Sequence, residues 1–141
     1  GSKFMALAHQ FIVRGMKEEL LIPSEQEYIF VSDHLMRYIQ DSMRWIHTSW
    51  NDQIELEGFP DEGFAVITEM EVERILEIIR PWKALFLASP ENFCLTIQED
   101  SDICYREVPV TRREVIEEME GWIGICDLAL KQHSQLVYQG L

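Results

Sequence analysis

The chain has 141 residues, of which 47% are hydrophobic, and its formal net charge is −13. This size and hydrophobic content suffice for the core of one domain, and they exclude a disordered chain, which combines low hydrophobicity with high net charge. No apolar run approaches the roughly 18 residues of a membrane-spanning helix. The balance of 12 Lys and Arg against 25 Asp and Glu argues against direct nucleic-acid binding, which depends on basic side chains.

Residues 1–4 resemble a cloning remnant, so we expect a single α+β domain over residues 5–141, with Met5 or Met16 as the native start. Residues 5–13 lack the basic leader and the small-residue cleavage site of a secretory signal. The three cysteines form no C-x-x-C pair, and this favours free thiols buried in the core of a cytoplasmic protein. Residues 11–21 fit a short helix or a strand.

Three helices are expected, and each follows a capping box, in which a Ser or Thr is followed three residues later by Glu. The pairs are Ser24 with Glu27, Thr68 with Glu71, and Thr111 with Glu114. The first helix, over about residues 25–50, has apolar residues at spacings of three and four. These are Tyr28, Val31, Leu35, Ile39, Met43, Ile46 and Trp50.

The second helix is expected over about residues 69–80, where Pro81 ends it. The third is expected over about residues 112–133 and contains Gly121 and Gly124. Glycine weakens a helix by about 1 kcal/mol relative to alanine. We therefore expect another element to approach the third helix closely at these two positions.

Three short runs rich in β-branched and aromatic residues lie between the second and third helices, at about 84–88, 93–97 and 103–108. Turn-forming residues at 89–92 and 98–102 separate them. The predicted fold is therefore α+β, with the three helices packed on a small antiparallel three-stranded sheet.

The sequence carries no motif for catalysis, metal binding or a cofactor. The four histidines, His9, His34, His47 and His133, form no i, i+4 pair and no H-E-x-x-H motif. The cysteines Cys94, Cys104 and Cys126 lie on predicted strands and on an apolar helix face. We interpret all three as core residues and predict no catalytic residue, metal ligand or cofactor.

The acidic residues are concentrated in one segment. Residues 51–77 hold nine acids against one base, so this stretch contributes −8 of the −13. Aromatic residues accompany the acids, and such a combination is typical of a surface that steers a basic partner and anchors it. The predicted partner-binding residues are Trp50, Asp52, Glu55, Glu57, Phe59, Asp61, Glu62, Phe64, Glu69 and Glu73.

The predicted function is that of an acidic cytoplasmic binding protein. It would neutralise a basic toxin or nuclease by occluding the active or nucleic-acid-binding surface, as bacterial immunity proteins do as a class. The acidity can equally serve solubility alone, or it can mimic a nucleic acid. Two other classes stay open: a structural subunit or chaperone, and a small enzyme or ligand-binding domain. The latter would have a pocket between sheet and helices, lined by Trp82, Phe86, Tyr105 and Trp122.

Overall fold

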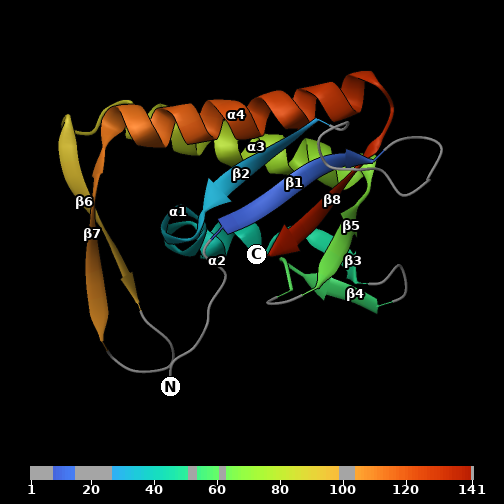
Figure 1. Cartoon of the computed structure of the whole chain (residues 1–141), viewed down its shortest axis with the longest axis horizontal. Helices are drawn as coiled ribbons and strands as arrows, with labels where there is room; N and C mark the ends of the chain where they lie inside the picture. The colour runs from blue at the N-terminus through green and yellow to red at the C-terminus, as the bar shows by residue number, and fades with distance from the viewer. Residues whose placement is uncertain (1–7, 15–26, 51–53, 61–62, 99–103, 141) are drawn as a thin grey trace.

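The larger of two sheets forms the centre of the protein. The computed structural model describes residues 8–14, 27–50, 54–60, 63–98 and 104–140 (Figure 1). Six strands form the larger sheet in the order β2-β1-β8-β5-β3-β4, and every neighbouring pair is antiparallel. The strands are β1 (Ala8–Arg14), β2 (Tyr28–Ser32), β3 (His47–Trp50), β4 (Ile54–Glu57), β5 (Phe64–Ile67) and β8 (Gln135–Gly140).

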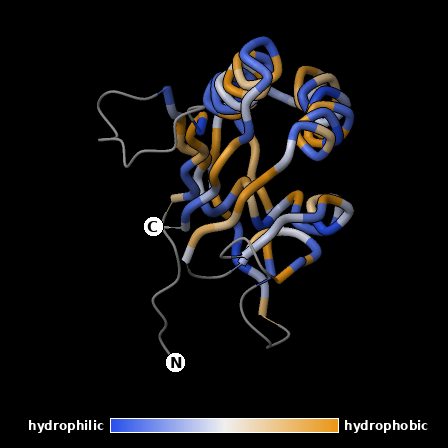
Figure 2. Tube along the Cα trace, turned by 90° about the vertical axis from the view of Figure 1, so that its right-hand side faces the viewer, coloured by the Kyte–Doolittle hydropathy of each residue, from blue (hydrophilic) through white to orange (hydrophobic). Residues whose placement is uncertain are grey.

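Two long helices, α3 (Glu69–Phe86) and α4 (Arg112–Lys131), lie side by side and cover one face of this sheet. The short helices α1 (Asp33–Tyr38) and α2 (Gln40–Met43) connect β2 to β3. Seen end-on, the helices gather on one side of the strands (Figure 2). A separate hairpin, β6 (Asn92–Gln98) and β7 (Tyr105–Thr111), joins α3 to α4, and β6 lies against α1.

The core lies between the larger sheet and the two long helices. Phe11 of β1 and Tyr138 of β8 are fully buried, and the ring of Phe11 lies 5.0 Å from that of Trp122 on α4. Side chains alternate between the two faces of a strand. The opposite face therefore carries Tyr28 and Phe30 of β2, which are partly exposed.

The prediction of one helix over residues 25–50 is wrong. This stretch contains β2, α1, α2 and β3 instead. Residues 28–31 are Tyr-Ile-Phe-Val, a run of aromatic and β-branched residues that suits a strand. The Ser32 side chain then caps α1 by accepting a hydrogen bond from the backbone N–H of Leu35.

The predicted three-stranded sheet is also wrong, since residues 84–86 belong to α3, which continues past Pro81 to Phe86. The other two predicted strands form the β6–β7 hairpin, and the six-stranded sheet was not predicted. Helix α4 is confirmed, and so is its capping box between Thr111 and Glu114.

Two local expectations fail as well. Thr68 makes no side-chain capping bond to α3, and Glu71 accepts a hydrogen bond from the backbone N–H of His47 instead. A Cβ added at Gly124 would meet no atom within 4 Å, and one at Gly121 would meet only Ile29 at 3.9 Å. The glycines of α4 therefore do not mark a tight approach.

Candidate functional site

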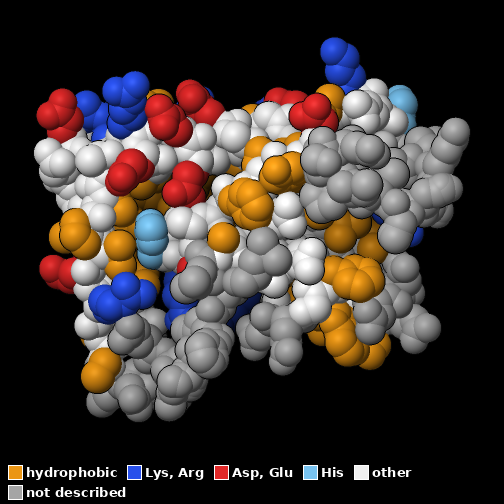
Figure 3. Space-filling view, viewed as in Figure 1, with side chains coloured by type: hydrophobic (Ala, Val, Ile, Leu, Met, Phe, Trp, Pro, Cys, Tyr) orange, Lys and Arg blue, Asp and Glu red, His pale blue; other side chains and the backbone are white. Residues whose placement is uncertain are grey.

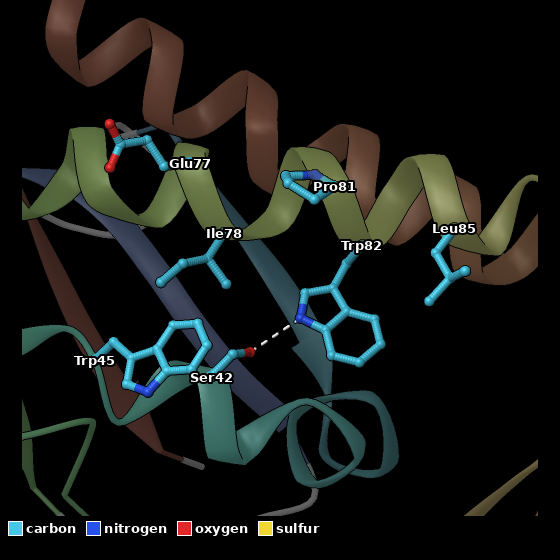
Figure 4. Close-up of a pocket in the computed structure, with 7 residues that line it drawn as sticks. All are labelled: Ser42, Trp45, Glu77, Ile78, Pro81, Trp82 and Leu85. Carbon is cyan, nitrogen blue, oxygen red and sulfur yellow. Dashed lines mark hydrogen bonds between the residues drawn. The ribbon is translucent and has the colours of Figure 1, made fainter.

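An apolar groove of about 300 Å³ lies between α2 and α3. Its lining residues are Ser42, Trp45, Glu77, Ile78, Pro81, Trp82 and Leu85. In Figure 4, Ile78 and Trp82 point from α3 toward Ser42 and Trp45, while Glu77 and Pro81 lie at the upper rim. Large apolar side chains are thus exposed beside a concave surface, and Trp45 and Leu85 are each 62% exposed.

Local contacts hold the aromatic wall of the groove in place. The indole Nε1 of Trp82 donates a hydrogen bond to Ser42 Oγ at 2.9 Å, and Ser42 Oγ donates to the carbonyl of Ile39 at 2.8 Å. The Trp82 ring also lies 5.7 Å from Phe86 and 5.8 Å from Tyr38. Trp82 is therefore fixed, whereas the described residues give Trp45 no comparable hydrogen bond.

Two carboxylates of α3 are unpaired among the described residues: that of Glu77, which lines the groove, and that of Glu73, one turn before it. Nearby basic side chains are engaged elsewhere: Arg74 lies 3.8 Å from Glu71, and Arg44 lies 3.5 Å from Asp41. Negative charge at the rim is therefore available to a partner.

Charged side chains on α4 differ from the carboxylate at this rim because several of them are paired with neighbouring side chains. Acidic and basic side chains gather along α4 at the top of Figure 3. Arg113 pairs with Glu117 within α4, and two bases of α3 pair with α4 acids, Lys83 with Glu120 and Arg80 with Asp127. Much of the α4 charge is thus neutralised by neighbouring side chains.

The three predicted aromatic anchors do not form one surface. Trp50 is opposite Ala65 in the register of β3 and β5, so Phe64, the next residue, faces the other side of the sheet. Phe59 stacks on Tyr138 at 4.6 Å and contacts Phe11, so it packs against the core. Only Phe64, 43% exposed, has the exposure of an anchor.

The predicted acidic residues are also divided. Glu55 lies 2.9 Å from His47, and Glu69 lies 3.4 Å from His133. Glu57 and Glu73 are exposed and have no ion-pair partner within the described part of the chain. The remaining three, Asp52, Asp61 and Glu62, lie outside the described residues.

The residues predicted to line an enzyme or ligand pocket do not meet. Trp122 is fully buried against Phe11, and Tyr105 is exposed on β7. Trp82 and Phe86 stack on each other beside the α2–α3 groove. The expectation of three core cysteines is also wrong: Cys126 is buried and its desolvation raises the pKa of its thiol, but Cys94 and Cys104 are exposed.

A buried polar chain connects β8, β1 and α1. His9 Nδ1 lies 2.6 Å from the Tyr138 hydroxyl, and His9 Nε2 donates to Asp33 Oδ1 at 2.8 Å. Arg37 Nε donates to the other carboxylate oxygen of Asp33 at 2.9 Å. Burial alone would raise the pKa of Asp33, but the bonds from His9 and Arg37 and their charges lower it.

These hydrogen-bonded side chains have a structural role. Tyr138 is 1% exposed and His9 8%, so the hydroxyl and the imidazole are shielded from a substrate. The contacts join two central strands to the first helix. Among the described residues, no three His, Cys, Asp or Glu side chains come together as a metal site.

Trp45 and Ser42 were not among the predicted site residues. Trp45 does not belong to the apolar stripe expected for residues 25–50, and a large aromatic residue outside such a stripe is a signal of an exposed contact. No helix in the described part of the chain is long and apolar enough to cross a membrane. Comparison with known families, with curated proteins and with solved structures found no match to this chain.

Proposed function

We propose that this chain binds a basic protein and inhibits it by covering its surface, as a neutraliser of a basic toxin or nuclease would. One observation carries the proposal. The carboxylates of Glu73 and Glu77, which have no ion-pair partner among the described residues, lie on the same helix as exposed Leu85, and Glu77 shares a groove with exposed Trp45.

This combination suits the physics of protein association. Unpaired surface charge steers an oppositely charged partner and raises its association rate. Exposed tryptophan next to a concave apolar surface provides the desolvated contacts that dominate interface energies. The groove supplies both, so we place the centre of the binding surface at α2 and α3.

The acidic residues of the sequence prediction extend this surface in part. Glu73 belongs to it directly because it lies one turn before Glu77. Exposed Glu57 on the edge strand β4 adds negative charge elsewhere on the molecule. The part played by Phe64 and by the residues outside the described ranges stays a prediction.

The test begins with a displayed library of small protein domains, from which binders of the full chain are selected. We expect basic binders whose association rate falls steeply as salt rises, since screening weakens steering. Reversing both α3 charges, Glu73→Lys with Glu77→Lys, should slow association at low salt by roughly tenfold.

Glu107→Lys is the matched control because Glu107 is exposed, is unpaired among the described residues and lies on the β6–β7 hairpin. This substitution should leave the association rate nearly unchanged. Neutral or acidic binders, or an association rate that does not respond to salt, would refute the proposed function.

A further inference from the structure

Strand β4 forms one edge of the larger sheet, and β3 is its one neighbour among the described strands. In Figure 1, β4 lies at the bottom of the sheet and no described strand or helix lies beyond it. The backbone N–H of Gly58, directly after β4, donates to the carbonyl of Ile46 at 2.7 Å. In an antiparallel ladder every second opposed pair is hydrogen-bonded, so Leu56 directs its backbone groups toward β3. The N–H and C=O groups of Glu55 and Glu57 therefore point to the open edge.

The two faces of this edge differ in chemistry. Side chains alternate along a strand, so Glu55 and Glu57 lie on one face and Ile54 and Leu56 on the other. The Glu55 side chain is 70% exposed, and its Oε2 lies 2.9 Å from His47 while its Oε1 has no partner among the described residues. Ile54 is 50% exposed and Leu56 is partly buried. The open edge is thus acidic on one face and apolar on the other.

The other strand edges of the described part are less suited to receive a strand. The outward N–H of Ser32 at the end of β2 already donates to Glu118 of α4 at 2.8 Å. Strand β7 contains Pro109, which has no backbone N–H, and β6 lies against α1. The edge of β4 therefore combines outward-pointing backbone groups with an ordered pattern of side chains.

This pattern selects the chemistry of an added strand. An extended segment that pairs with a sheet edge gains its affinity from backbone hydrogen bonds and its specificity from alternate side chains. Residues opposite Glu55 and Glu57 would share the acidic face, where basic side chains are complementary. The residue between them would share the face of Leu56, where an apolar side chain packs. A second copy of β4 would instead oppose glutamate to glutamate, and directly opposed like charges are destabilising.

We infer that β4 receives an extended segment of the basic partner as an added antiparallel strand, in which basic residues alternate with apolar ones. This inference rests on the proposed function and identifies the backbone shape and the side-chain pattern by which the basic partner is recognised. The edge lies near the groove, because a Cβ at Gly58 would be 3.6 Å from the Cα of Arg44, where α2 ends. One partner can therefore contact both.

Nuclear magnetic resonance of the full chain tests the inference with the peptide N-acetyl-Lys-Val-Lys-Val-Lys-amide. We expect the peptide to slow hydrogen exchange of the Glu55 and Glu57 backbone amides, because each gains an acceptor. The Leu56 amide already faces β3 and should change little. The scrambled peptide N-acetyl-Lys-Lys-Lys-Val-Val-amide has the same charge and should protect neither glutamate amide. Equal protection by both peptides, or protection by neither, would overturn the inference.

N-methylated peptides separate strand addition from charge attraction. In the antiparallel pairing, the lysines opposite Glu55 and Glu57 direct their N–H groups toward β4, and the valines direct theirs away. N-methylation of the central lysine should therefore abolish the protection, whereas N-methylation of the valine before it should preserve it. Equal binding of the two methylated peptides would refute strand addition. Loss of protection with the methylated valine alone would refute the antiparallel orientation.

A charge reversal on the edge tests the register. Glu57→Lys should weaken binding of the alternating peptide by roughly fivefold, because a favourable cross-strand pair becomes a repulsive one. Glu57 is exposed, so the fold should persist, which circular dichroism verifies. Glu91→Lys is the matched control, since Glu91 is exposed and lies outside the helices and strands. Equal weakening in both variants would show that net charge alone attracts the peptide, and it would refute the site.

The two proposals can fail separately. If basic domains are selected as expected, but neither they nor the peptide protect the Glu55 and Glu57 amides, the proposed function stands and the edge site is refuted. If the alternating peptide protects these amides as expected but no basic domain is ever selected, the edge site stands and the proposed function fails.

Discussion

Ser42 and Trp82 are joined across α2 and α3 by a 2.9 Å hydrogen bond between hydroxyl and indole nitrogen. The same hydroxyl donates to the carbonyl of Ile39. Ser42 is buried, so these two consecutive hydrogen bonds hold Trp82 of α3 against α2 and the residue that precedes it.

Ser42→Ala is expected to lower the free energy of unfolding by about 1–2 kcal/mol, because it removes both bonds and leaves the indole N–H of Trp82 without its acceptor. Chemical denaturation measures the loss. Ser49→Ala on β3 is the control, since the Ser49 side chain makes no hydrogen bond with the described residues, and it should change stability by less than about 0.5 kcal/mol. Equal effects of the two substitutions would contradict this role of Ser42.

Pro81→Ala should raise the free energy of unfolding by about 1–2 kcal/mol. A proline inside a helix costs about 3 kcal/mol through the lost hydrogen bond and steric conflict, and part of the gain is offset because alanine loosens the unfolded chain. Thermal and chemical denaturation check this. Pro90→Ala, outside the helices and strands, should instead be neutral or slightly destabilising. A loss of stability in Pro81→Ala would show that α3 needs the proline.

Asp33 links the stability of the fold to pH. Its folded pKa lies below the ordinary value of 3.8. The ionised group therefore stabilises the fold above about pH 4, and this contribution is lost as pH falls through the folded pKa. Asp33→Asn should cost about 1–3 kcal/mol at neutral pH, and its difference from the unmodified chain should shrink below about pH 4.

Denaturant unfolding measured from neutral pH to about pH 2 tests this dependence. Asp41→Asn is the control because the Asp41 side chain is 92% exposed and its pairing with Arg44 is loose, at 3.5 Å. It should change stability by less than about 0.5 kcal/mol throughout. A difference between Asp33→Asn and the unmodified chain that does not vary with pH would refute the linkage.

Two glycine substitutions should have opposite effects. Gly63 has a φ of +83°, and a Cβ there would lie 2.9 Å from Trp50 Nε1. Gly63→Ala should therefore destabilise the fold by about 1–3 kcal/mol. Gly124→Ala places a methyl group in open space on α4 and should stabilise the fold by up to about 1 kcal/mol. Thermal denaturation of the pair measures both, and a shift of the same sign in both would contradict this account.

Helix α4 and its N-terminal cap could be predicted from the sequence. Thr111 and Glu114 form the predicted reciprocal cap, and the helix that follows has a long apolar face. The β6–β7 hairpin could be predicted as well, because its strands are each 7 residues long and contain β-branched and aromatic residues. Both elements are determined by neighbours in the sequence.

The larger sheet could not be predicted in this way. Strands β3, β4 and β5 have only 4 residues each, too few for a periodic pattern to be distinguished from part of a helix. The spacing of Tyr28, Val31, Leu35 and Ile39 fits a helix although the chain changes from β2 to α1 at Ser32. Long-range pairing, such as Phe11 with Tyr138, decides these segments.

The groove was missed for a related reason. Its lining comes from α2 and α3, and the end predicted for α3 at Pro81 is too early, since the helix continues to Phe86. The helix continues because Trp82 and Phe86 pack one turn apart on the inner side, against Tyr38. Packing between helices thus compensates for the local cost of the proline.

The position of β8 has a consequence for synthesis on the ribosome. β8 pairs with β1 on one side and β5 on the other, yet it is made after the other strands that the structure describes. Without β8, the β1–β2 pair and the three-stranded unit β5-β3-β4 have no common partner, and the facing edges of β1 and β5 are unpaired. Two half-sheets that are each formed by strands earlier in the chain are therefore joined into one sheet only by the pairing of β8 with both.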